Sequence, residues 1–307
     1  MPQARSTTPA ATERPARARR RRWLPVLLAW VFVLELVAAA AVPARLERDR
    51  FARHAQVVVP TRRPVSPPPP PLIVSDRAVR LIGLGGPASD RLLSRIASNM
   101  GAAVAAVEGF WGVDWARIIS VVAAGSDDQF RAAAGGGPES QWADIAAVTV
   151  ADHVDPGTRV AVGERIVFAP GAANMSDPAL RIVLTHELFH YAARADTALD
   201  APQWLTEGVA DFVARPSTPK PADALSIALT LPSDADLATP GPQRSLGYDR
   251  AWWFARFIDD SYGAAKLRAF YLAVGGVGHT DVPSALRDVL NTDYSGVLAR
   301  WKEWMLR

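Results

Sequence analysis

Residues 175–196, "MSDPALRIVLTHELFHYAARAD", carry the clearest helix signal in the chain. Asp177 can cap a helix here, and Pro178 suits the first turn, where its missing N–H group is not needed. His186 and His190 are four residues apart, so a helix directs both imidazoles to one face, about one turn apart. We therefore expect a helix through this segment that ends near residue 194 and presents two histidines together.

The residues His186, Glu187 and His190 follow the spacing H-E-x-x-H. Two neutral imidazole nitrogens on one helix face can bind a zinc ion, and a carboxylate beside them can act as the general base for a water molecule that the zinc activates. The alternative is an ordinary helix whose two histidines are satisfied by neighbouring side chains and bind no metal. The spacing alone does not separate these two interpretations.

The following segment, "DAPQWLTEGVADFVARP" at 200–216, predicts a second, short helix that Pro216 ends. Catalytic zinc commonly takes three protein ligands and keeps a fourth position for water, and Glu207 can be the third ligand. Asp211, four residues further on, lies on the same helix face and can accept a hydrogen bond from a ligand imidazole. Most other side chains of this helix are apolar, so its carboxylates are expected to be buried and to need partners.

Cysteine is absent from the chain, which excludes disulfides and thiolate metal ligands. Histidine, aspartate and glutamate remain as ligands for a zinc site. The formal net charge of +3 comes mainly from arginines near the N-terminus, so we predict no nucleic-acid partner. We expect a monomer.

The N-terminal region predicts a membrane anchor. Residues 1–22 are a basic, cytoplasmic tail, and residues 23–42 are an apolar stretch of the length, about 20 residues, that crosses a bilayer as a helix. A cleavable signal peptide is the alternative, because "AVPA" at 41–44 offers small residues near a cleavage point. Residues 43–71 form a proline-rich stalk. In either case residues 72–307 are exported as one extracytoplasmic domain.

The domain at 72–307 predicts an α+β fold, with a small mixed or antiparallel sheet packed on a helical part. Strands are expected at 72–84, 117–124, 145–151 and 164–170, and a helix around 88–108. Helices follow for most of the remaining chain. The strand at 164–170 is expected to present a free edge to an extended peptide.

The segments "HELFH" and "WLTEGVADF" together resemble the gluzincin metallopeptidases, and the second closely resembles the peptidase MA-like domains of bacterial exported proteins. The specific likeness covers about 164–275. It implies a zincin-type catalytic domain in which His186, His190 and Glu207 bind zinc, Glu187 is the general base and Asp211 supports a ligand histidine.

The resemblance also implies a group that stabilises the oxyanion formed when water attacks a carbonyl. Tyr248, at the expected start of the helix over 248–263, is the candidate, and an ordinary packed aromatic is the alternative interpretation. His279 and His153 are weaker candidates.

We therefore predict a membrane-anchored, extracytoplasmic zinc metallopeptidase that hydrolyses peptide or protein substrates. Two competing interpretations remain. One is a zincin-fold binding module that keeps the metal and recognises extracytoplasmic or cell-wall peptides without turnover. The other is a structural domain without metal.

Overall fold

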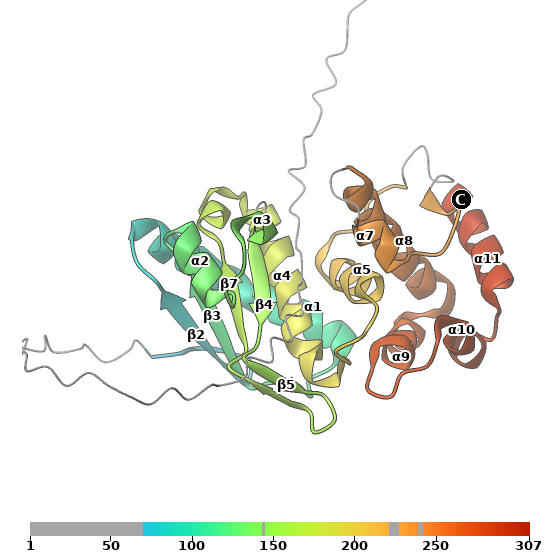
Figure 1. Ribbon diagram of the computed structural model, residues 1–307, viewed down its shortest axis with the longest axis horizontal. Coiled ribbons are helices and arrows are strands. Elements are labelled where there is room, and N and C mark those ends of the chain that lie inside the picture. The colour runs from blue at the N-terminus through green and yellow to red at the C-terminus, as the bar shows by residue number, and fades with distance from the viewer. Residues whose placement is uncertain (1–69, 143–144, 221–226, 239–241) are drawn as a thin grey trace, which may run out of the picture. The chain divides into compact units, whose positions relative to one another are not determined.

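The computed structural model describes residues 70–142, 145–220, 227–238 and 242–307 (Figure 1). The predicted basic tail at 1–22 and the predicted membrane helix at 23–42 lie outside these residues, and so does nearly all of the predicted stalk at 43–71. Within the described ranges, no helix combines the length and apolar character that crossing a bilayer requires.

The structure is α+β with a small mixed sheet, as predicted. Three central strands are parallel, and an antiparallel strand pairs at each edge, in the order β1-β2-β3-β7-β4. A separate antiparallel hairpin is formed by β5 and β6. The strands are β1 (Leu72–Val74), β2 (Arg77–Gly83), β3 (Ile118–Ala123), β4 (Ala147–Val150), β5 (His153–Asp155), β6 (Val160–Val162) and β7 (Arg165–Phe168).

Helices cover both faces of the sheet because the central strands are apolar on both sides. One face packs on two long helices, α1 (Pro87–Trp111) and α4 (Asp177–Ala193), and contributes to the main core. The other face, around β7 and β4, packs on α2 (Asp127–Ala133) and α3 (Glu139–Trp142) in a second core. Two 3-10 helices, η1 (Pro170–Asn174) and η2 (Arg194–Asp196), flank α4.

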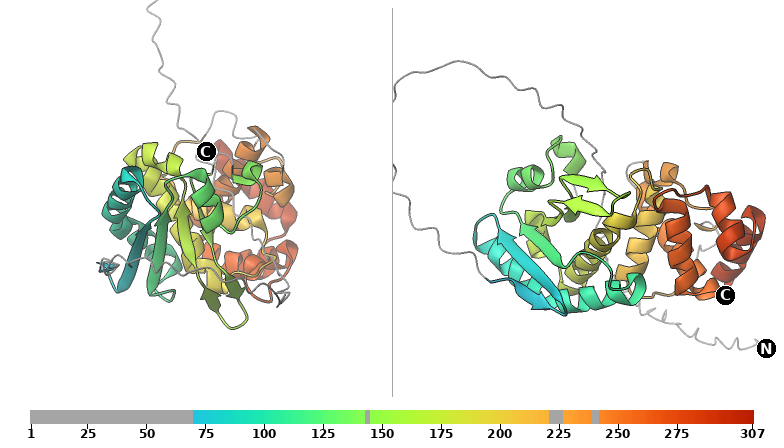
Figure 2. Two further views of the ribbon diagram at one scale, coloured as in Figure 1. Left: turned by 60° about the vertical axis from the view of Figure 1, so that its left-hand side comes forward. Right: turned by 90° about the horizontal axis from the view of Figure 1, so that it is seen from below.

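The C-terminal part is helical, and α1 and α4 lie between it and the sheet (Figures 1 and 2). The first of these helices, α5, packs on both α4 and α8. Trp252, Trp253 and Trp301 are buried and form part of the main core. The helices are α5 (Gln203–Ala214), α7 (Asp234–Ala238), α8 (Pro242–Tyr262), α9 (Ala264–Gly275), α10 (Val282–Leu290) and α11 (Tyr294–Leu306).

Helix α4 is the centre of the domain. Every residue from Val183 to Ala193 is buried, so this segment has no solvent-facing side. Ser176 caps the helix, with its hydroxyl 3.4 Å from the Ala179 N–H, and Asp177 is instead the first helical residue. The prediction of a helix ending near residue 194 is confirmed, and the expected cap moves by one residue.

Three sequence expectations are wrong in detail. Residues 72–84 form two strands because the chain reverses after Val74, with Ser75 at a φ of 54°. The strand β7 has no free edge, since β3 and β4 pair with it on either side. Helix α8 begins at Pro242, so Tyr248 lies in its second turn rather than at its start.

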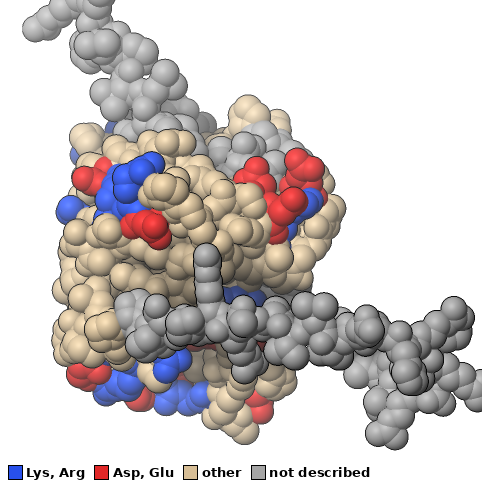
Figure 3. Space-filling model, turned by 90° about the vertical axis from the view of Figure 1, so that its left-hand side faces the viewer, with Lys and Arg blue, Asp and Glu red and all other residues tan. Residues whose placement is uncertain are grey.

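Charged side chains on the face drawn in Figure 3 gather toward its upper and lower margins, with acidic and basic residues close together. Ion pairs on this domain include Arg117 with Asp76, Arg131 with Asp128, and Arg165 with Asp152. Because at least one partner in each pair is well exposed, water and salt screen them, and each contributes little to the free energy of unfolding.

Helices α5 and α8 approach closely at Gly208. A Cβ atom at this position would lie 2.7 Å from the Ala251 main-chain oxygen and 2.9 Å from its Cβ. Backbone atoms cannot move aside as a flexible side chain can, so the packing of the two helices requires glycine here.

We predict that Gly208→Ala destabilises the protein by about 1–3 kcal/mol through overpacking. The matched control is Gly101→Ala, which lies in the interior of α1 with nothing within 4 Å of the added Cβ atom. Helix propensity alone should make the control more stable by up to about 1 kcal/mol. Urea unfolding of both variants measures the difference, and equal shifts in the same direction would contradict the assigned helix contact.

Candidate metal centre

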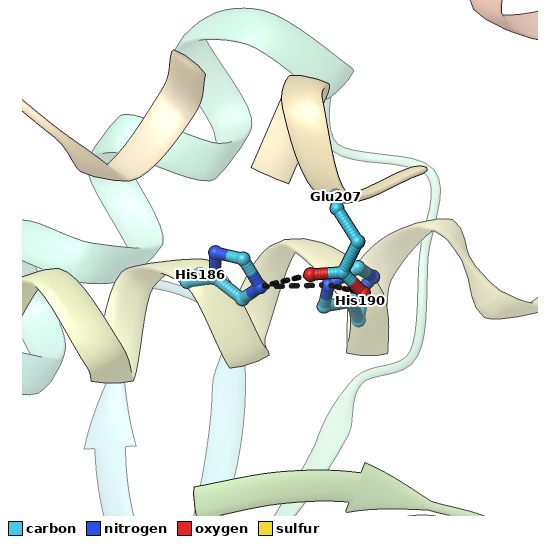
Figure 4. Close-up of side chains that lie close together, drawn as sticks. All are labelled: His186, His190 and Glu207. Carbon is cyan, nitrogen blue, oxygen red and sulfur yellow. Dashed lines mark hydrogen bonds and ion pairs between the residues drawn. The ribbon is translucent and has the colours of Figure 1, made fainter. Parts of the chain in front are cut away.

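Two helices bring the predicted ligands together. His186 and His190 lie one turn apart on α4, and Glu207 reaches them from α5 (Figure 4). One ligand atom from each side chain lies within 4.8 Å of the other two, and the exposed fractions of the residues are 2%, 4% and 0%. These three residues could hold a metal ion.

The distances fit a shared ion. The two Nε2 atoms are 3.0 Å apart, and Glu207 Oε2 lies 3.3 Å from His186 Nε2. Glu207 Oε1 lies 3.8 Å from His190 Nε2. A tetrahedral ion with ligand bonds of about 2 Å places its ligand atoms roughly 3.3 Å from each other, so the observed set brackets that value.

Asp211 fixes the orientation of the first histidine, as predicted. Its Oδ1 lies 3.0 Å from His186 Nδ1. An ionised carboxylate only accepts hydrogen bonds, so Nδ1 carries a proton, and Nε2 is the nitrogen directed to the cluster that a metal would use. Burial raises the pKa of Asp211, but its contact with His186 and the charge of Arg215 outweigh burial and leave that pKa below its ordinary value.

The two imidazoles have opposite pKa shifts. Burial lowers the pKa of His186, but the carboxylates of Asp211 and Glu207 outweigh burial and raise it well above its ordinary value. Burial lowers the pKa of His190, and the neighbouring charges of His186 and Arg194 lower it further. The carboxylates of Asp211 and Glu207 thus favour the protonated form of His186, whereas burial and the two positive neighbours disfavour that form of His190.

Thr149 holds the general base predicted from sequence. Its hydroxyl oxygen lies 2.8 Å from Glu187 Oε2 and 2.9 Å from the Glu187 main-chain oxygen, and both residues are buried. The sequence analysis missed Thr149. The strand around it was predicted, but the strand pattern gave no sign that its side chain faces α4.

Strand β4, which carries Thr149, is an edge of the sheet. Ala146 accepts a hydrogen bond from the Ala169 N–H, so alternation along the antiparallel ladder turns the backbone groups of Ala147 and Thr149 away from β7, although both residues are buried. Arg194 Nη2 donates to the Thr149 carbonyl at 2.9 Å. The edge beside the cluster is therefore β4 rather than the predicted strand at 164–170.

The remaining candidates lie in different settings. Tyr248 is buried on α8, the helix that packs on α5, and its predicted role remains a prediction. His279 pairs with Asp200 at 3.2 Å. His153 is exposed on β5.

We predict that the purified protein binds one divalent ion per chain at this cluster. His186→Ala and Glu207→Ala should each lose that ion, because a site with two protein ligands is too weak to retain it through purification. His153→Ala is the matched histidine control and should retain the ion. Metal content per chain is the measurement, and an unchanged content in His186→Ala would exclude the cluster as the site.

Asp249 predicts a pH dependence of stability. Burial raises its pKa to about 6, against the opposing charge of Arg215. A carboxyl whose folded-state pKa is raised contributes stability below its unfolded pKa of about 4, and this contribution is lost as the pH rises through about 6. From pH 4 to pH 8 the free energy of unfolding of the wild type should therefore fall by up to about 3 kcal/mol relative to that of Asp249→Asn.

Urea unfolding of both metal-free proteins across this range measures the loss. Contributions from the histidines cancel in the difference because both proteins contain them. Parallel stability curves would contradict the raised pKa.

No model of a known protein family matches the sequence, and a search of curated proteins finds no match either. The interpretation of this site therefore depends on the side-chain geometry described above: two imidazoles and a carboxylate directed to one point, an aspartate that orients one imidazole, and a threonine that holds the adjacent glutamate.

Proposed function

We propose that this protein is a gluzincin-type zinc metallopeptidase with a zincin-type catalytic domain. The observation that carries the proposal is the buried cluster of His186, His190 and Glu207, with Glu187 held next to it. Two imidazole nitrogens and one carboxylate oxygen suit zinc, whereas calcium and magnesium prefer oxygen ligands alone. Three protein ligands leave one position for water or substrate.

When bound here, zinc supplies a Lewis acid that polarises a carbonyl group and makes a water molecule acidic at neutral pH. Glu187 then accepts a proton from the attacking water and passes it to the leaving amine. The Thr149 hydroxyl, 2.8 Å from Glu187 Oε2, keeps the carboxylate in one position for both transfers. We propose Tyr248 as the group that stabilises the oxyanion.

A peptide or protein is the substrate we propose, because a general base beside a zinc-polarised carbonyl suits the hydrolysis of an amide bond. The edge of β4 does not supply the docking strand. Ala147 and Thr149, whose backbone groups turn away from β7, are 0% and 3% exposed, and Arg194 donates to the Thr149 carbonyl.

The sequence before the domain supports an extracytoplasmic location. The arginines at 19–22 precede the apolar stretch at 23–42, and this order keeps the N-terminus in the cytoplasm. We propose a single-pass anchor that holds the peptidase outside the membrane.

The test is Glu187→Gln, compared with wild type on a diverse peptide library in the presence of zinc. Because Glu187 is not a ligand, the variant should keep the metal. Loss of the general base should lower turnover by about 10²–10⁴-fold. Glu139→Gln, on the short helix α3 and distant from the cluster along the chain, is the control and should retain full turnover.

Equal product from wild type and Glu187→Gln would dismiss Glu187 as the base. If neither protein cleaves any peptide while both retain zinc, the binding module is the correct interpretation. Peptide binding to the wild type, measured by calorimetry, then identifies its ligand class.

A further inference from the structure

A row of charged side chains leads away from the metal centre into the C-terminal helices. His186 contacts Oδ1 of Asp211 through Nδ1. The second oxygen of Asp211, Oδ2, accepts a hydrogen bond of 3.1 Å from Nη1 of Arg215. Arg215 follows directly after α5, one turn beyond Asp211. Asp211 therefore lies between an imidazole and a guanidinium, each on a different oxygen.

Arg215 is itself held in place from α8. Its Nη1 and Nη2 atoms both donate to Asp249 Oδ1, each at 3.2 Å. Its guanidinium also stacks over the Trp252 ring, 3.8 Å from the ring centre. A planar guanidinium fixed by stacking and by two hydrogen bonds loses little further freedom on contacting another carboxylate. The group is thus preorganised to orient Asp211.

The orientation of Asp211 matters because its carboxylate can rotate. A carboxylate bound on one oxygen alone can turn and exchange its two oxygens. With Oδ2 fixed by Arg215, Oδ1 remains directed at His186 Nδ1, and the imidazole keeps its Nε2 atom toward His190 and Glu207. Outer partners of this kind commonly change metal affinity when they are removed.

We infer that Arg215 is a positioning residue of the metal centre, which acts through Asp211 on His186 and ties the affinity for metal to the packing of α8. This inference rests on the proposed zinc site and goes beyond it. No sequence motif pointed to Arg215. Arg215 lies one residue further from the ligands than Asp211 does, because it donates to the Asp211 carboxylate, which in turn contacts the His186 imidazole.

The charge of Arg215 gives the opposite expectation, so the direction of the effect is informative. A positive charge near a bound cation repels it, and removing that charge would tighten metal binding. Arg215 is, however, flanked by Asp211 and Asp249 at 3.1 and 3.2 Å, which offset its charge. Weaker binding on removal of Arg215 therefore supports positioning, and tighter binding would mean that repulsion dominates.

The experiment measures zinc affinity of the full-length protein by competition with a chromophoric chelator. Arg215→Met, which keeps the length of the side chain but not its donors, should bind zinc about 3- to 10-fold more weakly, less than the 10- to 100-fold typical of a direct partner of a ligand. Arg215→Lys keeps the charge and a single donor nitrogen, and it should recover part of the affinity. Cobalt(II), used as a spectroscopic probe, should show altered visible bands in Arg215→Met.

Arg256→Met is the matched control. Arg256 lies on α8, 5.8 Å from the centre of the same Trp252 ring, and donates to Ser217. It should lower stability without changing the zinc affinity or the cobalt spectrum. If Arg215→Met fails to fold, Asp249→Ala, which removes the anchor of Arg215 and leaves Asp211 intact, should show the same weaker binding to a smaller extent.

Unchanged or tighter zinc binding in Arg215→Met would overturn the inference and leave the proposed peptidase untouched. A wild-type protein that binds no zinc would overturn both. A wild type that binds zinc but cleaves nothing would overturn the peptidase alone, and weaker zinc binding in Arg215→Met would still support the positioning role.

Discussion

The domain depends on one costly arrangement: the carboxylate of Glu207 is fully buried against two imidazoles from another helix. Removing a charge from water costs several kcal/mol unless partners compensate it. Compensation requires one axial position of α5 along α4 and one rotation of α5 about its own axis. A small shift of either would separate Glu207 from His186 and His190. The electrostatic need of one side chain therefore fixes how two helices pack.

The other side of α5 meets an equally strict requirement. Gly208, next to Glu207 in the chain, allows the backbone of α8 to approach at Ala251. The polar face of α5 therefore fixes its position against α4, and the residue with no side chain fixes its position against α8. Arg215 completes the link, because its guanidinium donates to both Asp211 and Asp249. Polar contacts and close packing thus agree on a single arrangement of three helices.

Much of this arrangement could be predicted from local sequence. The spacing of His186 and His190 places both on one helix face, and the apolar context of Glu207 indicated burial, so the cluster could be predicted from sequence. The contacts that depend on tertiary packing could not be predicted. The side chain of Thr149 meets Glu187 because β4 lies over α4, and strand alternation alone does not identify which helix a strand face meets.

The start of α8 was misplaced for a related reason: Pro242 begins that helix within a segment whose glycine and prolines favour a loop. The order of strands was also beyond sequence, so β7 was expected at an edge that β4 occupies.

The edges of the sheet have a further consequence for self-association. Exposed strand edges can template pairing with unfolded or partly folded chains, which leads to aggregation. Here β1 has three residues and β4 has four, so each edge offers few backbone groups. Arg194 donates to the Thr149 carbonyl, so this backbone acceptor is not available for pairing with another strand. The guanidinium also adds a positive charge to the β4 edge. Ala147, Val148 and Thr149 are also buried, so the β4 edge is a poor template for self-association.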